Sequence, residues 1–460
     1  MKTIENQLKL KDRLLLKVFN TYAYYCCEIA EMQQKVLDYM NNTGAYALII
    51  EFNETNQYRR QEYIQIMDKQ ITEVLNSLLR KKSITLQQWK WMKINRWKME
   101  LSTLYFLPDT HTENVTFHPM TICHYSLTIR LSRCLRYILR PIYKQVAYKL
   151  TFETGADAIH AVAKYAHKNL LRSTTLFATI HIHDLFTIFP HEQTLELLQR
   201  FLFENVLETH INGIANEIII ELVRLFLNNQ YILHENKLYK QIRGSHFKSP
   251  MTTLLADIYI YYWQQDLVKI LHDKNEVFGR HFNEIFMTWN GTEDSLRHVI
   301  DTINRTHGHL RMTVNIHDNI NYLDANISFT YGKLKTKVAR NLNTDAYSLP
   351  YVYGHRRFHF LTLLHAALIR ATQCCSELFE FINECNDLQI SFQYNGFDNN
   401  YFTRTLRLFL QEFHIDNLKI QSGEVFYDPN LYQQLRRSVF DYVMQLTKNK
   451  HYNKLIHFEE

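Results

Sequence analysis

Two short segments carry side chains whose types and spacing could do chemistry. In "TIHIHDLF" (179–186), His181 and His183 alternate along an apolar run, so both imidazoles would point to one face of a strand, and Asp184 follows directly. This spacing is typical of a metal site, because imidazole is a common ligand of zinc and manganese. The second segment, "VFGRHFNEIFMTW" (277–289), has a strand-turn-strand pattern with Asn283 and Glu284 at its tip.

Other catalytic arrangements are missing from the sequence. There is no G-x-S-x-G motif and no Gly-rich phosphate loop. The seven cysteines include no C-x-x-C pair, so they suit neither a disulfide framework nor a zinc knuckle and are expected to be reduced thiols. A zinc or manganese hydrolase of H-x-H-x-D-H type remains an alternative, although Leu185 and Phe186 follow Asp184 and leave that pattern incomplete.

Basic side chains are concentrated in two stretches. In "RKKSITLQQWKWMKINRWK" (80–98), three tryptophans alternate with bases, which would suit stacking on nucleotides with the cations on phosphates. Farther along, arginines recur at spacings of three and four, on one face of a helix that Pro141 should disturb. The candidate nucleic-acid contacts are Lys90, Lys93, Lys98, Arg130, Arg133, Arg136 and Arg140. For the first stretch, the competing interpretation is an amphipathic helix with buried tryptophans and solvated lysines. For the second stretch, it is an arginine face that pairs with acidic residues inside the protein.

The order of the expected elements is typical of an α+β protein. Apolar residues at helical spacing, such as Leu8, Leu14 and Phe19, predict two or three long helices in residues 1–100. The later segments predict a strand near 176–183, a helix over 191–207, two strands around 234–236, a helix over 249–267 capped by Ser249, the hairpin 277–289, a hairpin that turns at Tyr331-Gly332, and helices after Leu349.

Composition excludes several classes of protein. With 460 residues and 46% hydrophobic content, the chain can bury a core in more than one domain. No N-terminal apolar segment and no run of about 18 apolar residues is found, so we expect an intracellular protein, nuclear or cytoplasmic, with no membrane partner. The net charge of +6 is only mildly basic and identifies no partner by itself, and the oligomeric state is left open.

Several motifs resemble those of one family when taken in order. They are Leu185, Phe186, Thr187, Phe189 and Pro190; then Tyr239, Gln241, Gly244, Ser249, Pro250, Ala256, Asp257 and Ile258; then Arg280 to Trp289; then the "YLDANIS" stretch with Asp324; and finally His355, Leu368, Arg370, Ala371, Cys375 and Ser376. This series resembles the reverse transcriptases of Penelope-like elements, whose palm is related to telomerase. The resemblance covers about residues 103–400.

The resemblance implies a right-hand polymerase-like architecture: fingers, a palm with a small antiparallel sheet, and a helical thumb, preceded by a helical N-terminal extension. The corresponding segments are the extension at 1–100, the fingers-like part at 101–170, the palm at 171–338, and the thumb-like part with a C-terminal tail at 339–460. It also implies that Asp257 and Asp324 have structural roles and that His355 is a hydrogen-bonded thumb residue.

The resemblance places His181, Asn283 and Glu284 at the three positions where the family holds two magnesium ions with carboxylates. Mg²⁺ is a hard cation that takes oxygen ligands, and two such ions repel unless anions lie between them. With a single carboxylate left, no functional catalytic residue and no cofactor are expected. The alternative is a rebuilt metal site in which the same three residues bind Mg or Mn.

Further departures from the family pattern point the same way. Lys248 replaces a glycine and would crowd the template or nucleotide path, although it could also contact nucleic acid. Asp109, Thr112 and His118 replace cations that hold incoming phosphates in the family.

The sequence therefore predicts a catalytically degenerate, retroelement-derived protein that binds RNA or an RNA/DNA duplex. The alternatives are an active RNA-directed DNA polymerase or terminal nucleotidyltransferase with an altered metal site, and a decayed mobile-element copy instead of a domesticated gene. If the positions are carried over correctly, the strands at 176–183, 278–283 and 284–289 lie side by side and bring His181 close to Asn283 and Glu284.

Overall fold

The computed structural model describes residues 12–19, 23–94, 99–110, 115–308, 310–330, 332–340, 357–415, 420–421, 424–425 and 428–448. The chain forms two compact units. The first comprises Met1–Thr151, Ile182–Lys269 and Val299–Thr313; the second comprises Phe152–His181, Ile270–His298 and Val314–Glu460. The four segments expected from the sequence do not coincide with these units, and their assignment to polymerase subdomains remains a prediction.

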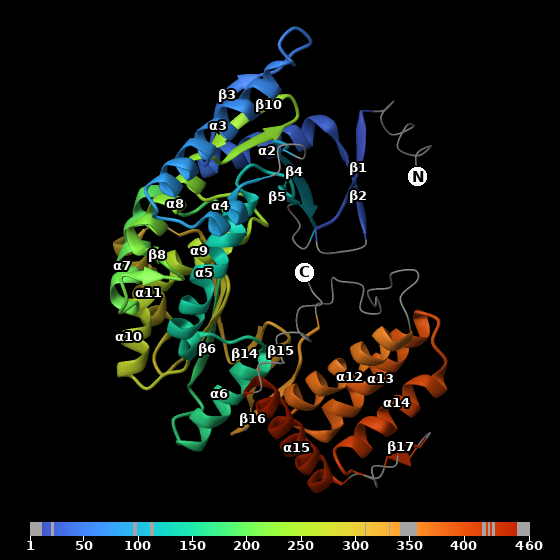
Figure 1. Cartoon of the computed structure of the whole chain (residues 1–460). Helices are drawn as coiled ribbons and strands as arrows, with labels where there is room; N and C mark the ends of the chain where they lie inside the picture. Colours follow the sequence, from blue (N-terminus) through green and yellow to red (C-terminus); the bar gives the residue numbers. More distant parts are fainter. Residues whose placement is uncertain are drawn as a thin grey trace. The chain divides into compact units, whose positions relative to one another are not determined.

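The first unit is built around a five-stranded sheet of order β3-β10-β9-β4-β5 (Figure 1). Its strands are antiparallel except where β4 runs parallel to β9. The strands of this unit are β1 (Arg13–Lys17), β2 (Tyr24–Glu28), β3 (Tyr46–Glu51), β4 (Ser102–Asp109), β5 (Thr116–Ile122), β7 (His210–Ile211), β8 (Ile214–Ala215), β9 (Tyr231–His234) and β10 (Lys237–Gln241). Its helices are α2 (Ile29–Thr43), α3 (Arg59–Arg80), α4 (Leu86–Met92), α5 (Ile129–Ala147), α7 (His191–Asn205), α8 (Asn216–Asn228) and α9 (Pro250–Trp263), with a short 3₁₀ turn, η2 (Tyr148–Leu150).

The helical N-terminal extension predicted for residues 1–100 also contains three strands among its described residues, which the sequence did not predict. Leu14 and Leu15 lie in β1, which pairs with β2, and β3 joins the five-stranded sheet through β10. The run "RLLLK" is too short for its periodicity to separate helix from strand, and pairing with a distant strand decides the outcome. Helices α2, α3 and α4 in the same stretch agree with the prediction of two or three helices.

Helix α5 continues through Pro141, where the sequence suggested a disturbance. The helix buries Leu131, Leu135 and Leu139 completely, and this face packs against α9. Proline cannot donate one of the backbone hydrogen bonds of the helix. Because most helical stability comes from burying an apolar face, and this face continues past Pro141, the helix persists. Ser249 is the residue before α9 as predicted, but its hydroxyl bonds to the Ser132 hydroxyl at 2.8 Å instead of capping the helix.

The second unit contains a four-stranded sheet of order β11-β12-β6-β13 and a three-stranded sheet of order β14-β15-β16. The strands are β6 (Leu176–Ile182), β11 (Phe278–His281), β12 (Glu284–Trp289), β13 (Met312–His317), β14 (Asn319–Tyr322), β15 (Ala325–Thr330), β16 (Lys333–Val338), β17 (Ile420–Gln421) and β18 (Glu424–Val425). The helices are α6 (Gly155–His167), α12 (Arg357–Cys374), α13 (Leu378–Tyr394), α14 (Asn399–Glu412) and α15 (Pro429–Lys448); α10 (Gln265–Asp273) and α11 (Glu293–His307) are divided between the units.

One core joins the sheets of the second unit to its helices. Phe177 on β6 and Phe286 on β12 stack with ring centroids 6.1 Å apart, and Tyr322 packs on Phe286. Leu364 and Phe381 of the C-terminal helices belong to the same buried cluster. The helices predicted after Leu349 therefore anchor the sheet that carries His181 and Glu284.

Two further expectations concern the whole chain. All seven cysteines are free, and six of them are buried, as expected of reduced thiols. Across the described residues, no helix is both long enough and apolar enough for a membrane span.

Gly244 is a position where the fold requires glycine. Its φ is +65°, and a Cβ there would lie 1.8 Å from the Phe186 carbonyl oxygen. Gly44, in the same unit, has φ +56° but open space around it. A side chain at position 244 would therefore meet both left-handed backbone and a clash with neighbouring backbone. A side chain at position 44 would meet only left-handed backbone.

We therefore predict that Gly44→Ala lowers the free energy of unfolding by about 1 kcal/mol, the cost of left-handed backbone for an L-residue. Gly244→Ala should cost about 3 kcal/mol or more, since the neighbouring backbone must also move. Urea unfolding of both variants measures the difference. Equal losses would contradict the close approach of Gly244 to Phe186.

Candidate functional site

His181, Asn283 and Glu284 come together in the second unit. Strand β12 pairs antiparallel with β11 and with β6, and the register places Glu284 opposite both His281 and His181. Phe282 and Asn283 form the two-residue turn between β11 and β12, with Phe282 at φ +52°. The prediction that these strands lie side by side and bring His181 to Asn283 and Glu284 is confirmed.

The side chains of this turn bond to one another. Nδ1 of His181 is hydrogen bonded to Oε1 of Glu284, and Nδ2 of Asn283 lies 3.4 Å from Nε2 of His181. The bond to Glu284 raises the pKa of His181 above its ordinary value of 6.5, against the opposing effect of burial. Near neutral pH the pair therefore gains imidazolium-carboxylate character. We call His181, Asn283 and Glu284 the turn triad.

The turn triad does not fit two magnesium ions. One carboxylate is present, and it accepts a hydrogen bond from an imidazole whose raised pKa favours a positive charge. A protonated imidazole cannot ligate a cation and repels one instead. Among the residues described, no group of three or more His, Cys, Asp or Glu side chains is arranged to hold a metal. The turn triad therefore gives no basis for catalysis by two metal ions.

His183 and Asp184, the other members of the H-x-H-D pattern, have their own partners in the first unit. Nε2 of His183 lies 2.7 Å from the Thr313 hydroxyl, and Asp184 forms an ion pair with Arg311 at 3.0 Å. These contacts account for both side chains without a metal. The hydrolase alternative gains no support from them.

Two of the replaced cation positions pair with each other in the first unit. Nε2 of His118 lies 2.8 Å from Oδ2 of Asp109, across the β4–β5 pair, and the His118 ring stacks on Phe19. In the resemblance both positions would carry phosphate-binding cations; here an imidazole and a carboxylate satisfy one another. Thr112 lies outside the described residues.

Lys248, at the family's glycine position, keeps a backbone that favours glycine. Its φ is +66° and its side chain is exposed, with Nζ 5.9 Å from the Phe247 ring centroid. A lysine in this region is unusual and costs on the order of 1 kcal/mol. The local shape of the motif is therefore retained although its residue type is not.

The arginine face of α5 is divided between internal and outward contacts. Arg140 forms an ion pair with the buried Asp257 at 3.2 Å, and Arg130 donates to the Lys93 carbonyl at 2.7 Å. Arg133 is exposed and Arg136 half-buried, so these two are the better nucleic-acid candidates. Among the residues that the structure describes, the internal-acid interpretation holds for Arg140 and for none of the other three arginines.

The family resemblance implied structural roles for Asp257 and Asp324 and a thumb role for His355. Asp257 pairs with Arg140, and Oδ1 of Asp324 accepts from the Gly155 N–H at 2.8 Å, so both have structural contacts. His355 lies outside the described residues, as does the nucleic-acid candidate Lys98.

The tryptophan-lysine stretch has a half-buried and an exposed part. Trp89 donates to Asn76 at 3.0 Å, and Nζ of Lys93 lies 4.4 Å from the Trp89 ring centroid. Lys90 is exposed, and Trp91 lies against Tyr137 of α5. Sequence reasoning missed Tyr137, although it stands one helical turn beyond Arg133 and therefore on the same face. Trp97 lies outside the described residues.

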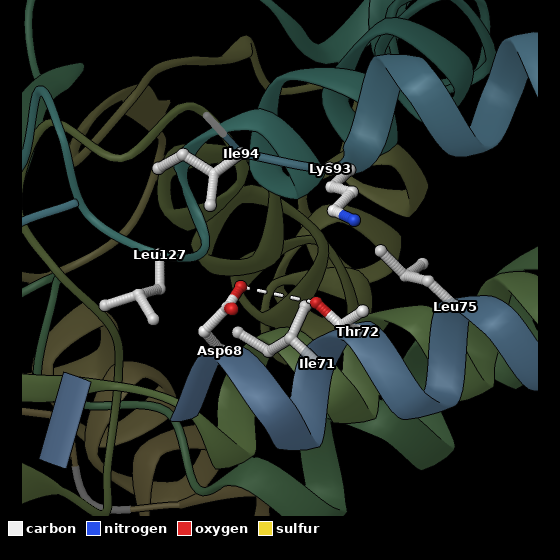
Figure 2. Close-up of a pocket in the computed structure, with 7 residues that line it drawn as sticks. All are labelled: Asp68, Ile71, Thr72, Leu75, Lys93, Ile94 and Leu127. Carbon is white, nitrogen blue, oxygen red and sulfur yellow. Dashed lines mark hydrogen bonds between the residues drawn. The ribbon is translucent and has the colours of Figure 1, made fainter. Parts of the chain in front are cut away.

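A small crevice opens beside this stretch. Figure 2 shows the residues that line it: Asp68, Ile71, Thr72, Leu75, Lys93, Ile94 and Leu127. Asp68 accepts a hydrogen bond from Thr72 at 3.3 Å. The space is about 200 Å³ and includes open solvent. Ligand sites usually occupy about 300–1,000 Å³, so the crevice is too small for a nucleotide.

Comparison with known proteins identifies the fold. No protein-family model and no curated protein matches the chain. Telomerase from Candida albicans, in complex with a TWJ fragment of telomeric RNA, is 11% identical with a TM-score of 0.52, over 97% of this chain and 69% of that one. Apo telomerase from Candida tropicalis is 9% identical with a TM-score of 0.50, over 99% and 76% of the two chains. The predicted α+β, right-hand polymerase-like fold is confirmed.

The first prediction from the site concerns the pKa of His181. Glu284→Gln should lower this pKa to below 6.5, because the carboxylate that raises it is lost while partial burial remains. Imidazole resonances followed by NMR over a pH series measure the change. Glu293→Gln, which removes an exposed carboxylate paired with Arg297, is the control and should leave the His181 pKa unchanged.

The same pair has a defined pH dependence. Because the folded pKa of His181 exceeds 6.5, its contribution to stability is complete below about pH 6.5 and is lost as pH rises through the folded pKa. An unchanged His181 pKa in Glu284→Gln would contradict the pairing.

The second prediction concerns Lys248. Glycine adopts left-handed backbone without strain, and this gain offsets the larger conformational entropy that glycine loses on folding. Lys248→Gly should therefore leave the free energy of unfolding unchanged or slightly raised. Lys269→Gly, on the exposed side of α10, should lower it by about 1 kcal/mol. Denaturant unfolding compares the two. A loss at Lys248 as large as at Lys269 would show that this backbone is not left-handed.

Proposed function

We propose that this chain is a non-catalytic, RNA-binding relative of the Penelope-like reverse transcriptases, with a polymerase-like fold that no longer adds nucleotides. The observation that carries the proposal is the turn triad: the only carboxylate among its three members is hydrogen bonded to the imidazole of His181. The proposal rests on the carry-over of the family's metal positions, which the adjacency of these residues supports.

The loss of two carboxylates has a large expected effect on nucleotide addition. Two unit charges about 4 Å apart interact by roughly 4 kcal/mol at an effective dielectric near 20, and more for a divalent ion. Each 1.36 kcal/mol of lost transition-state stabilisation slows a reaction about tenfold. The imidazolium character of His181 adds repulsion of the metal to this loss. Polymerase activity with Mg²⁺ is therefore expected to be absent, and no cofactor is required.

Nucleic-acid binding is supported by separate features. Exposed Lys90 and Arg133 project from α4 and α5, and Lys248 is also exposed. One of the telomerases with a similar fold was solved with a fragment of telomeric RNA. We propose RNA or an RNA/DNA duplex as the ligand, held through phosphate contacts that release counterions, in the nucleus or the cytoplasm.

A second candidate function is favoured by one observation. His181, Asn283 and Glu284 lie together, and each side chain carries a nitrogen or oxygen atom that could ligate a metal once His181 is neutral. An RNA-directed DNA polymerase or terminal nucleotidyltransferase with an altered Mg or Mn site would use this arrangement. Mn²⁺ is the more demanding test, since it accepts nitrogen ligands more readily than Mg²⁺.

Binding and chemistry are tested on one purified sample. We predict a shift of labelled RNA or RNA/DNA duplex that weakens steeply between 50 and 200 mM salt, by about a hundredfold or more if several phosphates are contacted. Primer extension should give no incorporation in Mg²⁺ or Mn²⁺. Arg133→Gln should weaken binding more than Arg140→Gln, because only Arg140 already holds an internal acid.

The outcomes separate the candidates. Extension by the unmodified protein in either metal would establish the nucleotidyltransferase instead. Binding that is flat with salt, or absent at low salt, would leave a protein-interaction role or decay of the gene. The triple change His181→Asp, Asn283→Asp and Glu284→Asp should restore little activity, since Asp109 and His118 still replace phosphate-binding cations.

A further inference from the structure

The basic charge of this chain is concentrated on neighbouring segments of the first unit. Residues 74–99 and 114–152 together contain thirteen Lys and Arg and no Asp or Glu, whereas the net charge of all 460 residues is +6. These segments include the end of α3, all of α4 and all of α5, and α4 packs against both helices (Figure 1). Segments rich in Lys and Arg and without Asp or Glu attract a polyanion.

An exposed aromatic pair lies within this basic region. The side chains of Trp91 on α4 and Tyr137 on α5 remain 39% and 62% exposed, with ring centroids 5.0 Å apart and planes at 68°. In this edge-to-face arrangement one ring supports the other and leaves aromatic surface open to solvent. A single exposed aromatic side chain would need no explanation, but a supported pair is pre-ordered for a flat ligand.

The helices hold this pair in place. Thr85 and Gln88 form a capping box that fixes the start of α4. Trp89 donates to Asn76 of α3, and Arg130 of α5 donates to the Lys93 carbonyl just after α4. The pair is therefore held by α4, which is hydrogen bonded to α3, and by α5, which is hydrogen bonded to the residue just after α4.

Two exposed cations, Lys90 and Arg133, flank the pair. Lys90 precedes Trp91, and Arg133 stands one turn before Tyr137 on α5; both are exposed. Within the portion of the chain that the structure describes, neither has a carboxylate within ion-pair distance. Open aromatic faces beside free cations match the combination by which proteins hold unpaired nucleotides.

We propose that Trp91 and Tyr137 form a stacking site for an unpaired base of single-stranded RNA, with Lys90 and Arg133 on the flanking phosphates. This inference rests on the proposed nucleic-acid binding and narrows it to a strand type. The bases of a duplex are stacked on each other and present no free face, so the aromatic pair discriminates for single strands.

The test uses the full chain, a fluorescein-labelled 12-nucleotide RNA without internal pairing, and a duplex of the same sequence. Tyr137→Ala should weaken single-strand binding about tenfold, and Trp91→Ala by a similar factor, within the range known for base stacking. Tyr137→Phe keeps the ring and should change it less than twofold. Duplex affinity should change less than twofold in all variants.

Tyr148→Ala is the matched control. Tyr148 is a 78% exposed tyrosine in the same acid-free segment, with no aromatic partner among the described residues, so its removal should be nearly neutral. Circular dichroism and a thermal melt show whether each variant is folded. A single-stranded DNA of the same sequence should lose affinity in the same proportion, because stacking does not read the 2′-hydroxyl.

The results distinguish this inference from the proposed function. If Tyr137→Ala behaves like Tyr148→Ala, or if duplex binding falls as much as single-strand binding, the stacking site is refuted while RNA binding stands. If Tyr137→Phe loses as much as Tyr137→Ala, the hydroxyl rather than the ring is responsible, which also refutes it. Absence of all binding at low salt refutes both.

Discussion

The antiparallel register between β12 and β6 determines what this protein can do at its hairpin turn. It sets Glu284 opposite His181, at a distance where imidazole and carboxylate bond directly. Two carboxylates at these positions would repel each other, and a bound cation would be needed to offset the repulsion. Here one partner becomes a cation when protonated.

A second pair shows the same logic in the other compact unit. His118 and Asp109 stand at positions where the resemblance implies phosphate-binding cations, and they bond to each other across β4 and β5. Two side chains that bond to one another have few hydrogen-bonding atoms left for a ligand. The backbone around such sites is nevertheless retained: Gly244 keeps a conformation and a close approach that only glycine tolerates, and Lys248 holds a left-handed φ of +66°.

The sequence was sufficient for the features that depend on short-range pattern or on ordered motifs. The hairpin at 277–289 and the position of α9 after Ser249 were predicted from local periodicity and turn or cap residues. The meeting of His181 with Glu284 was predicted from the family resemblance, which supplied the strand order. It failed where distant partners decide: β1 forms a strand because β2 lies beside it. Likewise, Arg140 turns inward because Asp257, 117 residues away in the chain, is buried next to it.

The aromatic pair illustrates a different limit. Trp91 was singled out from its interleaving with lysines, but periodicity could not tell whether its ring faced the core or solvent. The answer depends on Tyr137, which belongs to another helix and supports Trp91 from the side. Trp89, two residues earlier, turns toward α3 and bonds to Asn76. The two tryptophans thus have different surroundings, which are set by the packing of three helices.

The claim on which this account rests most heavily is that the turn triad is complete without a metal. Calorimetric titration of the protein with Mn²⁺ at pH 7 tests it most directly, compared with Glu284→Gln and with His181→Asp. We expect no saturable binding in the millimolar range for the unmodified protein or for Glu284→Gln, and weak binding to appear in His181→Asp, where two carboxylates face each other. Saturable Mn²⁺ binding by the unmodified protein that Glu284→Gln abolishes would contradict the account.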